Sequence, residues 1–149
     1  MNPHYVPIAK ESTIISAWTN RHRIGDTMFQ GLRTVIYHVD DIEQAKAWYS
    51  SVLGFAPYFD EPFYVGFNVG GFELGLDPDV SGVSKGNNEV AYWGTEDAEE
   101  ELRRLIELGA EQYREVQDVG GGIRVGMAKD PFGNVIGIIE NPNFKVETD

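Results

Sequence analysis

The chain has 149 residues with 24 acidic and 12 basic side chains, and its formal net charge of −12 argues against nucleic-acid binding, which needs clustered Lys and Arg. It has no cysteine, which excludes disulfides, thiolate metal sites and a cysteine nucleophile. No apolar run approaches a membrane span and no secretion signal is recognisable at the N-terminus, so we expect a cytoplasmic protein without a membrane partner.

Two stretches of the chain read alike. Residues 32–55 and 87–110 each predict a strand, an acidic cap, an amphipathic helix and a Leu-Gly stop. The offset is 55 residues, because Gly54 falls on Gly109 and Thr34 falls on Glu89. This pattern predicts an internal duplication. We expect residues 1–28 to be an N-terminal extension and residues 29–149 to form one domain, with modules at about 31–78 and 88–143.

Acidic residues mark the start of each expected helix. Asp40 stands three residues before Glu43, and Asp97 stands three residues before Glu100, which is a carboxylate version of the capping box. The glycine of each Leu-Gly stop suits the left-handed conformation that ends a helix. The two helices are therefore expected between these signals.

Glycine hairpins and a tight turn divide the remaining sequence into strands. The expected strands are Tyr64 to Val69, Phe72 to Leu76, Gln112 to Gln117, Ile123 to Lys129 and Val135 to Glu140. The segment from Asp77 to Asn88, which is rich in Gly, Ser and Asn, is expected to link the modules. Each half then reads as β-α-β-β-β.

Several short motifs in this order resemble the glyoxalase, bleomycin-resistance and extradiol-dioxygenase proteins, the vicinal oxygen chelate superfamily. They are Val39-Asp-Asp-Ile42, Trp48-Tyr49 with Val52-Leu53-Gly54-Phe55, Leu108-Gly109-Ala110, and Asp130-Pro-Phe-Gly-Asn134 with Glu140-Asn-Pro142. The resemblance covers about residues 31–143. It implies an α+β fold of two tandem βαβββ modules, in which a curved mixed sheet forms a cup with helices on the outside and the ligand inside. It also implies a homodimer.

The resemblance implies four metal-ligand positions inside the cup for the metal-dependent members. They fall on Thr34 and Glu89 in the first strand of each module, and on Gly75 and Gly137 in the last. Two glycines supply no ligand side chain, whereas a divalent catalytic site needs about three His or carboxylate ligands. We therefore predict no metal cofactor and keep a divalent metal as the alternative.

Strand alternation assigns further residues to the cup. It puts Val35, Tyr37 and Val39 on the opposite face, under the helices. The predicted ligand-binding residues are Thr34, Ile36, His38, Glu73, Glu89, Ala91 and Trp93. Val135 or Ile139 would add to the apolar wall. A makeshift metal site from His38, Glu73 and Glu89 stays open.

Three functions are compatible with this arrangement. Aromatic faces and carboxylates favour a binding protein that sequesters a cationic or amphipathic small molecule, as a resistance protein would. The alternative is a metal-dependent lyase, isomerase or dioxygenase with Glu89 as one ligand. The third is a metal-free acid–base enzyme with Glu89 as the catalytic group, aided by His38 or Tyr64, if burial favours the protonated form of Glu89.

Overall fold

The computed structural model describes residues 30–144 and 146. The chain divides into two units, Met1–Arg33 and Thr34–Asp149, and all the described helices and strands lie in the second. The predicted N-terminal extension, residues 1–28, lies outside the described residues. None of the helices in the described part is long and apolar enough to cross a membrane.

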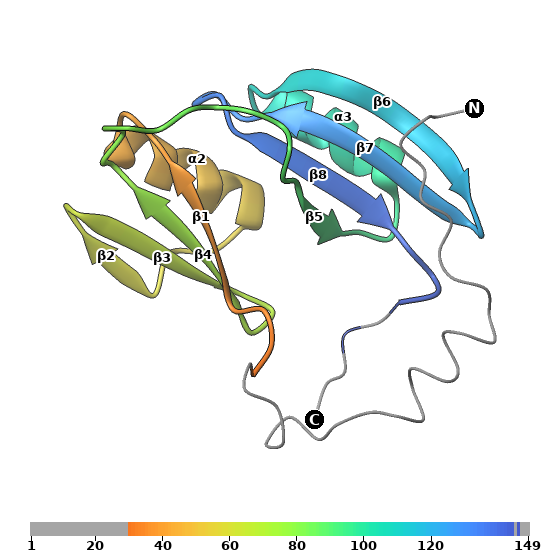
Figure 1. Ribbon diagram of the computed structural model, residues 1–149, viewed down its shortest axis with the longest axis horizontal. Coiled ribbons are helices and arrows are strands. Elements are labelled where there is room, and N and C mark those ends of the chain that lie inside the picture. The colour runs from red at the N-terminus through yellow and green to blue at the C-terminus, as the bar shows by residue number, and fades with distance from the viewer. Residues whose placement is uncertain (1–29, 145, 147–149) are drawn as a thin grey trace. The chain divides into compact units, whose positions relative to one another are not determined.

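The first module follows the predicted order of elements (Figure 1). Its elements are β1 (Thr34–His38), α2 (Ile42–Leu53), β2 (Phe59–Glu61), β3 (Tyr64–Val69) and β4 (Phe72–Asp77). The strands form a four-stranded sheet in the order β1-β4-β3-β2, called the first sheet below. Strand β1 pairs with β4 in parallel, whereas the other pairs are antiparallel.

The second module repeats this arrangement. Its elements are β5 (Ala91–Gly94), α3 (Ala98–Glu107), β6 (Glu111–Gly120), β7 (Ile123–Lys129) and β8 (Val135–Glu140). They form the second sheet in the order β5-β8-β7-β6, with β5 and β8 parallel. The prediction of an α+β fold with two tandem βαβββ modules is confirmed. The two mixed sheets are hydrogen-bonded separately in the described residues, rather than closed into one.

Helix α2 joins the cores of the two modules. Its Tyr49 is buried and donates a 2.6 Å hydrogen bond to Asp130 in the turn between β7 and β8. Trp48 donates from Nε1 to the carbonyl oxygen of Leu108 at 2.7 Å. Ile136 of β8 belongs to the core cluster around Tyr49, and Trp48 packs against the core cluster of α3. The modules therefore form one folding unit.

The N-cap of α2 differs from the prediction by one residue. Asp41, in extended conformation, accepts a 3.0 Å hydrogen bond from the backbone N–H of Gln44, so Asp41 and not Asp40 is the cap. Asp97 caps α3 as predicted, by accepting from the N–H of Glu100. The two caps are 56 residues apart, one more than the predicted offset, because α2 has 12 residues and α3 has 10.

Candidate functional site

The face of the first sheet opposite α2, called the open face here, carries the predicted residues of β1. Tyr37 and Val39 are buried against α2, so Thr34 and Ile36 on the alternate positions lie on the open face, and Ile36 is 47% exposed. Val35 was expected under the helix, but it is 38% exposed because β1 is an edge strand of its sheet.

Four side chains on the open face form a hydrogen-bonded group, the Glu73 cluster, which consists of Thr34, Tyr58, Tyr64 and Glu73. The hydroxyl of Tyr64 donates to Oε1 of Glu73 at 2.7 Å, and the hydroxyl of Thr34 donates to the same oxygen at 3.3 Å. The hydroxyl of Tyr58 donates to Oε2. Phe59 lies beside Tyr64, with a centroid separation of 6.2 Å between the rings. The cluster brings together one carboxylate and several aromatic rings.

Strand register and two glycines make room for this cluster. Thr34 pairs with Glu73 across β1 and β4, and Gly66 pairs with Gly75 across β3 and β4. A Cβ atom on Gly75 would overlap the ring and hydroxyl of Tyr64, and one on Gly66 would crowd Tyr58 and Glu73. The tyrosines therefore lie over backbone that carries no side chains.

The hydrogen bonds set the protonation states of the cluster. Donation from Tyr58, then Tyr64 and Thr34, lowers the pKa of the Glu73 carboxyl below its ordinary value. The pKa of Tyr58 is raised chiefly by its hydrogen bond to Glu73, and the pKa of Tyr64 is raised by burial and then by Glu73. At neutral pH the carboxylate is thus ionised and both phenols are neutral donors.

In the second sheet, the strand-face prediction is wrong for Ala91 and Trp93. The register pairs Ala91 with Ile136 and Trp93 with Ile138, which are core residues. Trp93 packs against the core and donates from Nε1 to the Tyr37 hydroxyl at 3.3 Å. Both residues therefore share the helix-covered face of this sheet.

The residue on the open face of β5 is Tyr92. It pairs with Gly137 of β8 and is 43% exposed. A Cβ atom on Gly137 would overlap the Tyr92 ring, just as one on Gly75 would overlap Tyr64. Val135 and Ile139, which alternate with Ile136 and Ile138, share this face as predicted.

Glu89 is not on a strand. It lies before β5 and is exposed, so the predicted half-buried carboxylate in an apolar cup is corrected. The register explains the error. Since Ile36 pairs with Gly75 and Tyr92 pairs with Gly137, the modules are offset by 56 residues here, and Val90 is the counterpart of Thr34.

His38 and Glu73 do not form a joint site. His38 pairs with Asp77, four residues along β4 from Glu73, which corresponds to roughly 13 Å of extended strand. Its Nδ1 lies 2.8 Å from the carbonyl oxygen of Asp79, so this nitrogen carries the proton and donates. Among the described residues, no group of three or more His, Cys, Asp or Glu could hold a metal ion.

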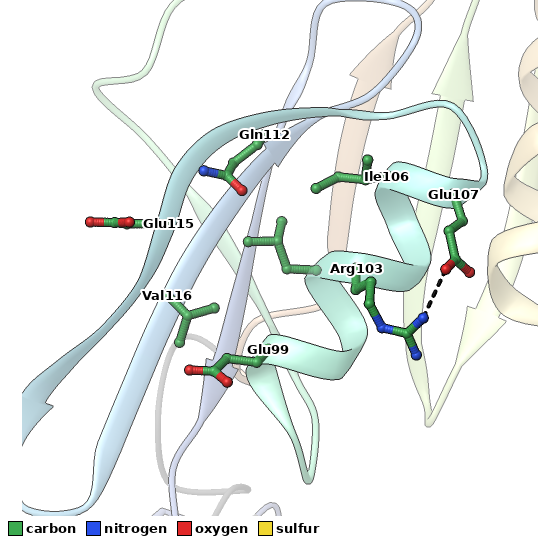
Figure 2. Close-up of a pocket in the computed structure, with 8 residues that line it drawn as sticks. Glu99, Arg103, Ile106, Glu107, Gln112, Glu115 and Val116 are labelled. Atoms are coloured by element: carbon green, nitrogen blue, oxygen red, sulfur yellow. Dashed lines mark hydrogen bonds and ion pairs between the residues drawn. The ribbon is translucent and has the colours of Figure 1, made fainter.

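A separate groove of about 410 Å³ lies between α3 and β6 (Figure 2). It is lined by Glu99, Leu102, Arg103, Ile106, Glu107, Gln112, Glu115 and Val116. The guanidinium of Arg103 is turned toward Glu107, with a 2.8 Å ion pair, and Glu99 pairs with Arg124. No residue predicted from the sequence to bind a ligand lines this groove.

Comparison with known proteins identifies the family. The sequence profile of the Glyoxalase/Bleomycin resistance protein/Dioxygenase superfamily matches residues 31–138, which is most of the chain. The chain belongs to this superfamily. The family expected from the short motifs is therefore confirmed. A search of curated proteins found no match.

Solved structures of superfamily proteins share the fold. A glyoxalase-related enzyme from Fulvimarina pelagi has a TM-score of 0.68 at 21% identity, covering 81% of this chain and 95% of that chain. A glyoxalase/bleomycin resistance protein from Albidiferax ferrireducens T118 has a TM-score of 0.59 at 19% identity, covering 77% and 100%. A glyoxalase/bleomycin resistance protein/dioxygenase from Nocardioides has a TM-score of 0.61 at 16% identity, covering 93% and 98%.

The residues at the superfamily's metal-ligand positions do not fit a metal. With the corrected register, the four positions hold Thr34, Gly75, Val90 and Gly137, of which only threonine has an oxygen side chain. Tyrosine rings occupy the space where a side chain on either glycine would begin. A divalent ion needs several His or carboxylate ligands, and these positions supply none.

Sequence reasoning singled out Thr34, Glu73 and Tyr64 but missed Tyr58 and Tyr92. Tyr58 precedes a strand too short to show alternation, and only its 2.9 Å backbone hydrogen bond to Gly66 places it beside Glu73. Tyr92 stands next to Trp93, so a shift of one residue in the predicted face replaced one aromatic residue by the other.

Proposed function

We propose that this superfamily member binds a small organic cation at the Glu73 cluster and works without the superfamily's metal. The observation that carries the proposal is an ionised carboxylate held between two tyrosine hydroxyls on the open face of the first sheet. A carboxylate receives charged hydrogen bonds, and aromatic rings attract a cation through their faces. Sequestration of such a compound is the corresponding biological role.

Two further features support a cationic ligand. The net charge of −12 attracts cations and repels anions at long range. Ile36 is exposed on the same face as Thr34, and Phe59 lies beside Tyr64, so apolar surface adjoins the carboxylate. A ligand with a positive group and an apolar body would use both parts of this surface.

A binding screen tests the ligand class. Isothermal titration calorimetry would compare aromatic primary amines, guanidines and quaternary ammonium compounds with carboxylate compounds of the same size. We expect cations to bind and anions not to bind. Glu73→Gln should weaken cation binding by about tenfold or more, the usual size of a charged hydrogen bond. Glu115→Gln, which removes one exposed carboxylate of β6, is the control and should leave affinity unchanged.

Metal content tests the metal-free part of the proposal. The protein would be incubated with Zn, Ni, Mn, Fe and Co in turn, desalted and measured by mass spectrometry, with Glu73→Ala in parallel. We expect no stoichiometric metal in either protein. One metal ion per chain would overturn this part and favour the alternative, a metal-dependent lyase, isomerase or dioxygenase.

We also propose a homodimer, as the superfamily resemblance implies. The exposed apolar residues Val35 and Ile36 on edge strand β1 support an association at this edge. Light scattering should give twice the chain mass of 16.7 kDa. A mass of one chain at micromolar concentration would contradict it.

A further inference from the structure

The hydroxyl donors of the Glu73 cluster are all directed inward. Tyr58, Tyr64 and Thr34 each have one hydroxyl proton, and each donates it to the Glu73 carboxylate. The carboxylate is ionised and the phenols are neutral at neutral pH, so this direction of donation is the stable one. Toward a ligand the cluster therefore presents oxygen lone pairs rather than protons.

The acceptor capacity that remains can be counted. A carboxylate offers about four acceptor positions, and the three hydroxyls use three of them, two on Oε1 and one on Oε2. Each phenolic oxygen keeps lone pairs after it has donated its proton. Oε2 of Glu73 and the oxygens of Tyr58 and Tyr64 can thus accept hydrogen bonds from one ligand group.

From this we infer that the cluster selects cations that carry several N–H donors, such as primary ammonium, guanidinium or amidinium groups, over quaternary ammonium groups. The inference rests on the proposed function and specifies its ligand class. A primary ammonium has three donors and a guanidinium has five, which match convergent acceptors. A quaternary ammonium has none, so it would leave the carboxylate and phenol oxygens without partners.

The aromatic rings alone would give the opposite preference. Quaternary ammonium groups bind well to cages of aromatic faces, where no hydrogen bond is needed. Sites built to hydrogen-bond a ligand, in contrast, discriminate strongly against analogues that lack the donor, because their own polar groups stay unpaired. The two kinds of recognition therefore give opposite orders of affinity for the same pair of ligands.

The test compares 2-phenylethylammonium with its N,N,N-trimethyl analogue by isothermal titration calorimetry on the full chain, with 3-phenylpropionate as the anionic probe. We expect the primary ammonium to bind at least about tenfold more tightly than the trimethyl compound, since lost hydrogen bonds to a charged group cost about this much. The anion should not bind. Equal or tighter binding of the trimethyl compound would overturn the inference.

The outcomes separate the inference from the proposed function. If both cations bind equally and Glu73→Gln abolishes both, the proposed function stands and the inference fails. If neither cation binds, the proposed function fails and takes the inference with it. Binding that survives in Glu73→Gln but is lost in a variant of the groove between α3 and β6, such as Glu115→Gln, would contradict both.

Tyr64→Phe provides a second variant with a specific readout. It keeps the ring but removes one acceptor oxygen and one donor to Glu73. We expect it to reduce the ratio of primary to trimethyl affinity, whereas loss of packing alone would weaken both ligands alike. Circular dichroism would confirm that the variant is folded. An unchanged ratio in folded Tyr64→Phe would contradict a role for this oxygen in selection.

Discussion

At the scale of single residues, Glu73 links the chemistry of the site to its pH dependence. Its pKa is lowered, so the stability it contributes is present above the unfolded value, about 4.3, and is lost as pH falls through the folded value. The pKa values of Tyr58 and Tyr64 are raised, so their contribution is present below about pH 10 and is lost as pH rises further.

Glu73→Gln should therefore lower the free energy of unfolding only in a window of pH. We expect the difference from the wild type to be largest between about pH 5 and pH 9 and to shrink at both ends, where Glu73 is protonated or the tyrosines ionise. Urea unfolding at a series of pH values measures it. Glu115→Gln, the control, should show no such window. A difference that is constant with pH would mean that the cluster is not coupled by protonation.

At the scale of elements, the helix caps decide where the repeat begins. Asp41 accepts from the N–H of Gln44, whereas its neighbour Asp40 is exposed and makes no such bond. Asp41→Ala should cost about 1 kcal/mol of stability, the usual value for an N-cap, and Asp40→Ala should stay within about 0.5 kcal/mol of the wild type. Thermal or urea unfolding of the pair checks this, and an equal loss in both would refute the cap assignment.

The elements were predictable because each has a local signal, whereas their faces in the second module were not. Three strands, Tyr64–Val69, Ile123–Lys129 and Val135–Glu140, have the predicted bounds because glycines and a tight turn flank them. Strand β5 has four residues, too few to show alternation, so its face was inferred from the repeat. Helices of different length moved the Leu-Gly stops relative to the caps, and a shift of one residue reversed the face.

That shift explains which site residues survived. Thr34, Ile36 and Glu73 lie in β1 and β4, which pair with each other and need no reference to the other module. Glu89, Ala91 and Trp93 were placed through the repeat and do not lie on the open face. Side-chain positions that depend on register between distant strands are set by tertiary packing, which local sequence does not encode.

At the scale of the whole molecule, the two modules share their core through α2 and carry a common negative charge. The core clusters around Tyr49 and Leu102 each include residues from, or pack against, the other module. The net charge of −12 acts over the whole protein and adds to the local charge of Glu73. Because this long-range contribution is screened by salt, it can be separated from the local one.

Cation binding should therefore weaken as salt rises, and more so in the wild type than in a variant with less charge. Raising salt from about 0.01 M to about 1 M shortens the screening length from about 30 Å to about 3 Å, which removes the field of distant carboxylates but leaves direct contacts at Glu73. A triple variant, Glu96→Gln, Glu111→Gln and Glu115→Gln, neutralises three exposed carboxylates of the second module. At low salt it should bind 2-phenylethylammonium more weakly than the wild type, and at high salt the two dissociation constants should converge. Equal constants at low salt would show that the net charge contributes nothing to binding and that Glu73 alone supplies the electrostatic attraction.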